Sequence, residues 1–133
     1  MRLNKEELNN VLPELIKVLK TTSTSAPLLA REIVLIMNQR RIEDGKFSKV
    51  FRDTTLRKIS NYIRDNEILP LMANNKGYYL STDINEIDAK IESFNSNIAA
   101  QTKARDGLIR YKQQILNEME LNVDKDPFGI DWD

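Results

Sequence analysis

Residues 68–81 constrain the fold of this chain more than any other stretch, because two short apolar runs around a turn replace the helical spacing of apolar residues here. The runs are 68–72 (ILPLM) and 78–81 (YYLS), and the turn is 73–77 (ANNKG). Asn and Gly supply the backbone conformations that tight turns between antiparallel strands require. The sequence therefore predicts a β-hairpin, with helical spacing on either side of it.

Two helices are expected before the hairpin region. Asn4 is a candidate N-cap for the first, and an apolar helical face follows it. Pro13 lies inside that pattern, so either the helix kinks there or its stable part begins there. Ser25 is a candidate N-cap for the second helix, with Pro27 in its first turn, and core spacing continues to about Arg40.

A loop and a basic helix are expected next. Residues 41–52 break the helical spacing and predict a loop, with Phe47, Val50 and Phe51 as its anchors in the core. Residues 53–66 predict an amphipathic helix whose outer face is basic and able to hydrogen-bond. Its apolar face consists of Leu56, Ile59, Tyr62 and Ile63, and its outer face of Arg57, Lys58, Asn61 and Arg64.

The predicted elements are thus two helices, a basic helix and a hairpin. This is the order of elements in a winged helix-turn-helix. The predicted fold class is therefore mainly α with a small β-hairpin. The sequence divides into a winged helix-turn-helix domain at 1–82, a long C-terminal helix for packing or dimerisation at 83–121, and an acidic flexible tail at 122–133. In a helix-turn-helix the second of the paired helices enters the major groove of duplex DNA.

The segment 54–82 (TTLRKISNYIRDNEILPLMANNKGYYLST), followed by 84–101 (INEIDAKIESFNSNIAAQ), resembles small winged-helix proteins of bacteriophages and prophages. The resemblance extends from Thr54 to about Leu108 and implies a DNA-binding protein of a phage or mobile element. The N-terminal half matches the family in outline, and the basic loop before the third helix is longer than in compact members. The most specific points are Leu56-Arg57, Ile63-Arg64, Leu69-Pro70 and Gly77-Tyr78-Tyr79.

The long helix is expected to begin at Asp83, a candidate N-cap with Glu86 at the capping-box position. Apolar residues then recur at alternating spacings of three and four, which is typical of a helix-packing seam. Gln101, Arg105 and Gly107 interrupt this seam. We expect its first half to pack on the winged domain or on a second subunit, and its second half to meet a partner helix. The candidate dimerisation residues are Ile84, Ile87, Ile91, Phe94, Ile98, Leu108, Ile115 and Met119, and Tyr111 lies in the same stripe.

The final residues combine acidic side chains with three large apolar ones, Phe128, Ile130 and Trp132. Such a segment has too little apolar content to fold alone. Three alternatives remain open for it: binding to a basic, apolar groove of a protein partner, folding back on the basic region in competition with DNA, or no role.

Charge is distributed unevenly, although the formal net charge is +0 at pH 7. The stretch from residue 40 to 64 has eight basic and three acidic residues, and the stretch from 117 to 133 has one basic and six acidic residues. Because phosphate contacts dominate affinity for nucleic acid, the basic stretch is the candidate DNA-binding region. The candidate residues are Arg40, Arg41, Lys46, Lys49, Arg52, Thr54, Arg57, Lys58, Asn61 and Arg64, with Lys76 at the hairpin turn.

Composition argues against several classes of function. The chain has no His, no Cys and four Gly, so it lacks His-dependent triads, His or thiolate metal sites and a phosphate-binding glycine loop. We therefore expect neither an enzyme nor a cofactor. The longest apolar run, residues 33–37, is far shorter than a membrane span, and the N-terminus does not resemble a leader, so the expected location is the cytoplasm of a bacterial host cell.

Two classes of function remain. The first is a duplex DNA-binding protein of a phage or mobile element, acting as a homodimer in replication or transcription control. The second is a non-enzymatic adaptor that engages proteins through the long helix and the acidic aromatic tail.

Overall fold

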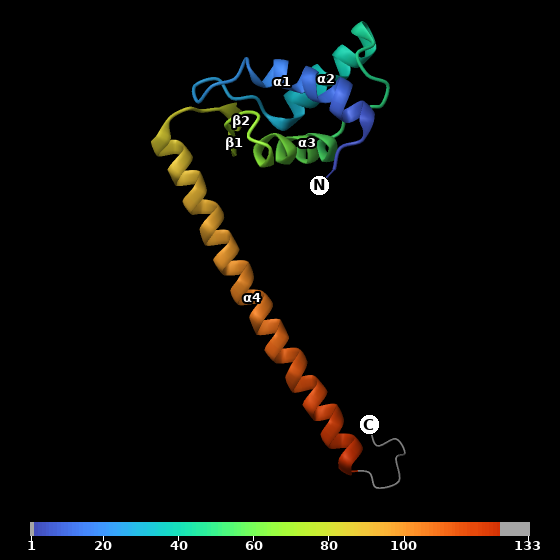
Figure 1. Ribbon diagram of the computed structural model, residues 1–133, viewed down its shortest axis with the longest axis vertical. Coiled ribbons are helices and arrows are strands. Elements are labelled where there is room, and N and C mark those ends of the chain that lie inside the picture. Colours follow the sequence, from blue (N-terminus) through green and yellow to red (C-terminus); the bar gives the residue numbers. More distant parts are fainter. Residues whose placement is uncertain (1, 126–133) are drawn as a thin grey trace. The chain divides into compact units, whose positions relative to one another are not determined.

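The computed structural model of the chain describes residues 2–125, with side chains through residue 121. Its helices and strands follow one another as the sequence predicts (Figure 1). This confirms the fold class: mainly α with a two-stranded antiparallel hairpin and a long C-terminal helix, an order of elements consistent with a winged helix-turn-helix. The elements are a π-helical turn (Glu7–Val11), α1 (Leu12–Leu19), α2 (Ala30–Asp44), α3 (Asp53–Asp65), strands β1 (Leu71–Asn74) and β2 (Gly77–Leu80), and α4 (Ile84–Lys125).

The chain divides into two compact units, Met1–Asp88 and Ala89–Asp133. The division falls inside α4, after its first turn. We call the first the winged unit and the second the helical unit. Within residues 2–125, no helix combines the length and the apolar character needed to cross a membrane.

The first helical segment begins where the sequence predicts, at Asn4. The backbone N–H of Asn4 donates to Glu7 Oε1 (2.9 Å), and the Glu7 N–H donates to Asn4 Oδ1 (2.8 Å), which is a reciprocal capping box. Pro13 lacks the N–H that an α-helix needs there. The chain accommodates it with a π-helical turn, in which the Leu12 N–H bonds to the Glu7 carbonyl.

The expected start of α2 at Ser25 is wrong. The helix begins at Ala30, and the Leu29 N–H at its N-cap donates to Glu32 Oε1 (2.9 Å). Leu28 is extended instead, because its N–H and carbonyl both bond to Tyr78 of β2, at 3.0 and 2.7 Å. A pairing between residues so far apart in the sequence leaves no local signal.

The expected end of α2 near Arg40 is also wrong. The helix continues to Asp44 and ends at Gly45, whose φ of 60° is the left-handed conformation common after a helix. The last turn lacks apolar spacing, since Ile42 is exposed, and this is why it resembles a loop in the sequence. The connection to α3 is therefore the shorter segment 45–52.

Two of the three expected anchors in this connection are buried. Phe47 and Phe51 pack edge to face with ring centroids 6.4 Å apart. Asn38 of α2 holds the Phe51 backbone on both sides: the Phe51 N–H donates to Asn38 Oδ1 (2.8 Å) and Asn38 Nδ2 donates to the Phe51 carbonyl (2.9 Å). Val50 is half exposed, so its predicted anchoring role is wrong.

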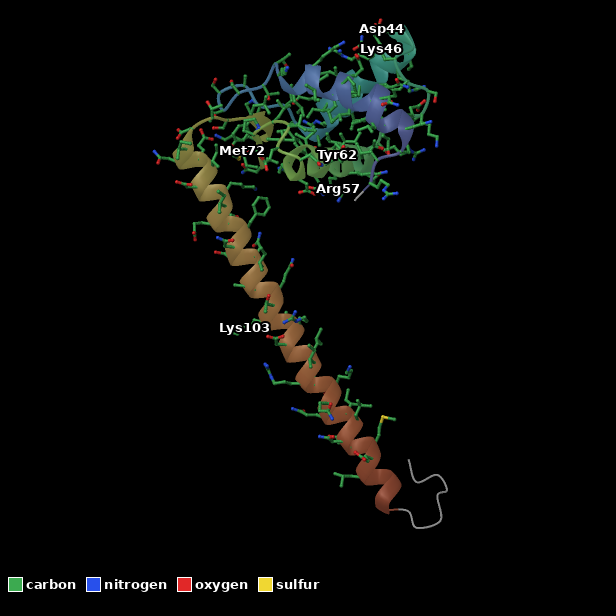
Figure 2. All side chains as sticks on the ribbon, in the orientation of Figure 1. Asp44, Lys46, Arg57, Tyr62, Met72 and Lys103 are labelled. Carbon is green, nitrogen blue, oxygen red and sulfur yellow. The ribbon has the colours of Figure 1, made fainter. Side chains whose placement is uncertain are left out.

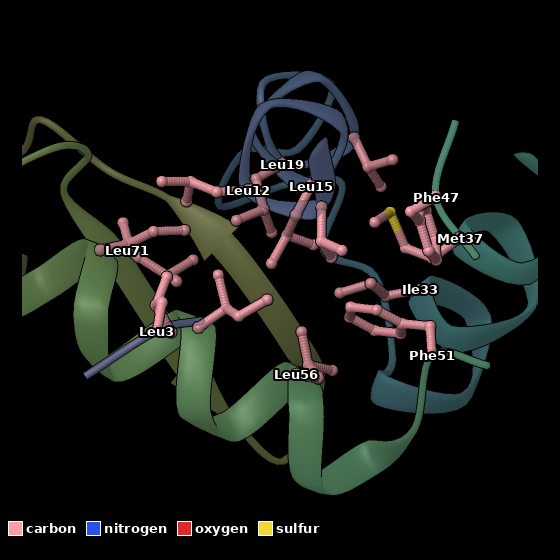
Figure 3. Packing of buried hydrophobic residues seen from close by; sticks show 14 residues of the cluster. Leu3, Leu12, Leu15, Leu19, Ile33, Met37, Phe47, Phe51, Leu56 and Leu71 are labelled. Carbon is pink, nitrogen blue, oxygen red and sulfur yellow. The ribbon is translucent and has the colours of Figure 1, made fainter. Parts of the chain in front are cut away.

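One apolar core joins the three helices to the hairpin. Figure 3 shows the side chains of α1, α2, α3 and β1 converging on it. Burial of such side chains stabilises the fold by roughly 1.5 to 3 kcal/mol each. The fully buried members are Leu15 and Leu19 of α1, Ile33 and Met37 of α2, Phe51 of the connection, and Leu56, Ile59 and Ile63 of α3.

The hairpin has the predicted antiparallel pairing, but β1 starts and ends later than expected, and β2 starts and ends one residue earlier. Asn74 pairs with Gly77 across the turn, and Asn74 Oδ1 accepts the Lys76 N–H (2.8 Å). Gly77 has a φ of 126°, and a Cβ added there would lie 2.3 Å from the Leu28 carbonyl oxygen. Glycine is therefore required at 77 by the close approach of the segment that precedes α2.

Asp83 caps α4 as predicted, since Asp83 Oδ1 accepts the Asn85 N–H (2.9 Å). The other bond of a capping box, from the Asp83 N–H to the Glu86 carboxylate, does not form, and both groups have other partners. The Asp83 N–H donates to Ser81 Oγ (3.2 Å), and Glu86 Oε1 accepts from Thr24 Oγ1 (3.0 Å). Glu86 thus ties the first turn of α4 to the turn that follows α1.

Gly77→Ala is expected to lower the free energy of unfolding by about 3 kcal/mol or more, because the added Cβ meets the Leu28 backbone as well as an unfavourable φ. Gly45→Ala is the matched control: its φ of 60° is also positive, but a Cβ there meets nothing within 4 Å, so a loss of roughly 1 kcal/mol is expected. Urea unfolding of both variants measures this. Equal losses would contradict the role of Gly77.

Candidate nucleic-acid interface

The outer face of α3 carries polar and basic side chains opposite the buried Leu56, Ile59 and Ile63. Their spacing of three and four residues places them on one side of the helix. Because the opposite face is anchored in the core, the outer face has a fixed orientation. Thr54, Arg57, Lys58 and Asn61 line an open, shallow depression on it.

Arg57 is exposed and, among the described residues, makes no hydrogen bond or ion pair. Lys58 differs, because its Nζ donates to Glu7 Oε1 at 2.7 Å. Burial raises the pKa of the Glu7 carboxyl, but hydrogen bonds from Lys58 and from the Asn4 backbone outweigh burial and hold that pKa below its ordinary value. One positive charge of the α3 face is therefore neutralised within the protein.

A second carboxylate from the N-terminal segment meets the connection before α3. Ser48 Oγ donates to Glu6 Oε2 (2.7 Å), and the backbone N–H groups of Ser48 and Lys49 both donate to Glu6 Oε1 (3.3 Å). The hydroxyl bond from Ser48 is the main reason why the pKa of Glu6 lies below its ordinary value. Lys49 and Arg52 line a groove here together with Thr55 of α3, and both basic side chains are exposed.

Arg64 has a structural role at the other end of α3. Its Nε donates to the Leu71 carbonyl of β1 (2.9 Å), and its Nη1 donates to Asn61 Oδ1 (3.3 Å). Burial lowers the pKa of the guanidinium. Arg64 thus holds the hairpin against α3, and it orients the Asn61 amide so that its NH₂ group is available outside the helix.

Two of the candidate basic residues, Arg40 and Arg41 in α2, bond to side chains within the winged unit. Arg40 Nη1 donates to Glu14 Oε1 (3.0 Å), and Lys17 pairs with the same carboxylate (3.1 Å). Burial raises the pKa of Glu14, and the bonds from Lys17 and Arg40 outweigh it. Arg41 Nε donates to Asn38 Oδ1 (3.3 Å).

The structure does not gather all eight basic residues of 40–64 on one face. Figure 2 shows Lys46 beside the end of α2 and Arg57 on the opposite side of the winged unit. Lys76 is exposed at the hairpin turn. The α3 face is thus formed by Thr54, Arg57, Lys58 and Asn61, with Lys49 and Arg52 near its N-terminal end.

The candidate dimerisation residues all lie on α4. Ile87, in its first turn, is half-buried, whereas Ile84 is exposed. The other six, with Tyr111, are exposed in the helical unit, and Phe128, Ile130 and Trp132 lie outside the described residues. Among the residues whose side chains are described, no group of three or more acidic side chains could hold a metal ion.

Sequence reasoning missed the carboxylates of Glu6 and Glu7, which lie beside the basic region. Glu7 and Lys58 are separated by 51 residues in the chain. The capping pattern around Asn4 gives Glu7 a sufficient local role, so nothing in the sequence indicates a second one.

Comparison of the chain with protein-family models, with curated proteins and with solved structures finds no match.

Glu7→Gln is expected to lower the free energy of unfolding at pH 7 by about 1 to 2 kcal/mol, because the variant loses the charge that Lys58 meets. The pKa of Glu7 is lower in the folded chain than the ordinary 4.5, so its stabilisation is present above that value and is lost as the pH falls through the folded value. Wild type and variant should therefore converge in stability towards pH 3.

Urea unfolding at pH 7 and at pH 3 measures this difference. Glu92→Gln is the control, because Glu92 is exposed and, within the described residues, makes no hydrogen bond or ion pair. A Glu7→Gln variant as stable as wild type at pH 7 would show that the contact with Lys58 contributes nothing.

Proposed function

We propose that this chain binds duplex DNA through the outer face of α3. The observation that supports this most is the exposed Arg57, which lies between Thr54 and Asn61 on the face opposite the buried side of α3 and has no hydrogen-bond or ion-pair partner among the side chains that the structure describes. A guanidinium left unpaired and held on a rigid helix is suited to a guanine edge or a phosphate.

The surrounding side chains suggest how each group would act. The NH₂ group of Asn61 can donate to adenine N7, while its oxygen has a second lone pair to accept from adenine N6. Thr54, Lys49 and Arg52 would bind phosphates near the start of α3, and Lys76 would bind phosphate or the minor groove at the hairpin turn. Lys58 contributes less positive charge than its sequence position suggests, because Glu7 pairs with it.

The proposed function includes an oligomeric state and a biological context. Exposed apolar residues along α4 support self-association as a homodimer, since a stripe of this kind on a soluble helix usually marks an interface. The resemblance to phage and prophage winged-helix proteins supports a role in replication or transcription control of a phage or mobile element, in the cytoplasm of a bacterial host. No cofactor and no catalytic group is part of this proposal.

A protein-interaction adaptor is the second candidate. Two observations favour it: Glu6 and Glu7 reduce the positive charge near α3, and the second half of α4 exposes Leu108, Ile115 and Met119. In this alternative the tail residues Phe128, Ile130 and Trp132 act as anchors for the protein partner.

Three substitutions with different expected signs test DNA binding. Arg57→Ala should weaken duplex binding by roughly 1 to 3 kcal/mol if the side chain contacts a base. Glu7→Gln should strengthen binding at low salt, because it releases Lys58 from a carboxylate, and this gain should fade as salt screens the charges. Lys46→Ala is the matched control and should leave affinity unchanged, since Lys46 lies on the opposite side of the winged unit.

Fluorescence anisotropy over a salt series, with random duplex and with DNA that flanks the gene, measures all three affinities. Arg64 is left intact because it supports the hairpin. Equal affinities for wild type and Arg57→Ala, or no binding at any salt concentration, would contradict the proposal and favour the adaptor.

A further inference from the structure

The helical unit exposes one long apolar seam. Its residues occupy positions of one alternating spacing of three and four, in which polar residues fill the remaining positions, so they share one face of the helix. Leu108 is 72% exposed and Ile98 is 60% exposed, and they belong to a stripe of exposed apolar side chains, a feature that typically marks an interaction surface. The seam consists of Ile91, Phe94, Ile98, Leu108, Ile115 and Met119.

The same spacing places polar side chains within the seam. Continued from Ile98, it passes through Gln101, Arg105 and Lys112 before the seam ends at Met119. In a parallel, in-register pair of helices, each seam residue faces its own copy. Arg105 would then face Arg105 and Lys112 would face Lys112, at close range and partly desolvated, which is unfavourable.

We propose that α4 pairs with α4 of a second copy of the chain in antiparallel orientation. This rests on the self-association in the proposed function and adds its direction and register. Antiparallel helices pair seam positions of one helix with those at the opposite end of the other. Ile91 then packs on the partner's Ile115, and Ile98 on the partner's Leu108.

The polar residues of the seam are matched in this register. Arg105 meets the partner's Gln101, and Lys112 lays its methylene stem along the partner's Phe94 while its ammonium reaches water. No layer brings two like charges together. A shift of one heptad in either direction would set Arg105 against the partner's Phe94 or Leu108, so polar matching selects this register.

Charges beside the seam agree with the same arrangement. Lys90 and Glu118 both flank the seam, and in the antiparallel register each lies opposite the other residue of the partner. The twofold axis passes at the level of Lys103, which Figure 2 labels on α4. The two Ile91 residues, at the N-terminal end of the seam, would lie roughly 36 Å apart at the rise of an α-helix. In a parallel pair they would be neighbours.

Cysteine cross-linking tests the orientation, and it is well suited to this chain because the sequence contains no cysteine. Full-length Ile91→Cys and Ile115→Cys variants are mixed and oxidised. The antiparallel pair predicts a disulfide-linked heterodimer of the two variants and almost no homodimer of either one alone. The parallel pair predicts the reverse, because each cysteine would then face its own copy.

A charge exchange provides an independent test by sedimentation. Glu118→Lys should weaken dimerisation about fivefold, and adding Lys90→Glu to it should restore the affinity of wild type. In a parallel pair these residues lie about 40 Å apart along the helix, so no restoration is expected.

Disulfide homodimers of Ile91→Cys, no restoration by the second substitution, a tetramer, or a monomer at about 100 μM would each overturn the proposal. Duplex binding is measured on the same variants. Loss of the antiparallel pattern with DNA binding intact would overturn the orientation alone, whereas absent DNA binding with intact cross-links would overturn the proposed function of α3.

Discussion

The paired backbone bonds between Leu28 and Tyr78 are the constraint on which the winged unit depends. They hold the segment before α2 in an extended conformation, so that α2 cannot begin until Ala30. They also bring the Leu28 carbonyl so close to β2 that residue 77 has to be glycine. The position of the hairpin and the start of the helix-turn-helix are thus set by one contact between segments distant in sequence. Arg64 adds a second contact of this kind, because its bond to the Leu71 carbonyl holds β1 against α3.

The packing of the winged unit also determines which charged side chains remain available to a partner. A simple count over residues 40–64 gives an excess of positive charge, but the N-terminal segment contributes carboxylates that offset part of it. Glu14 meets Arg40 and Glu7 meets Lys58, and Arg64 turns inward. The side chains that remain available to a partner are those around Arg57. They are Thr54 and Asn61 on α3, and Lys49 and Arg52 just before it. This is a smaller and more directional site than the charge count predicts, which suits base contacts supported by a few phosphate contacts.

Local patterns were sufficient to predict most of the fold. The spacing of Leu56, Ile59 and Ile63 identified the buried side of α3, and therefore its outer face, because a helix with one apolar side can be oriented in only one way. The hairpin turn was predictable for a similar local reason. Long-range contacts were not: the start of α2 depends on Tyr78, and the pairing of Lys58 depends on Glu7. The prediction for Val50 is wrong because a short apolar run has no periodicity that separates an inward-facing from an outward-facing side chain.

In the function that we propose, the outer face of α3 is the surface that contacts duplex DNA. Backbone amide NMR shifts, recorded while a short duplex is added to the full chain, test it most directly. Duplex binding by this face predicts the largest shifts from Thr54 to Asn61, with smaller ones at Lys49, Arg52 and Lys76, and no change at Lys46 or in the last turn of α2. Shifts confined to α4, or shifts at Lys46 as large as those at Arg57, would contradict it.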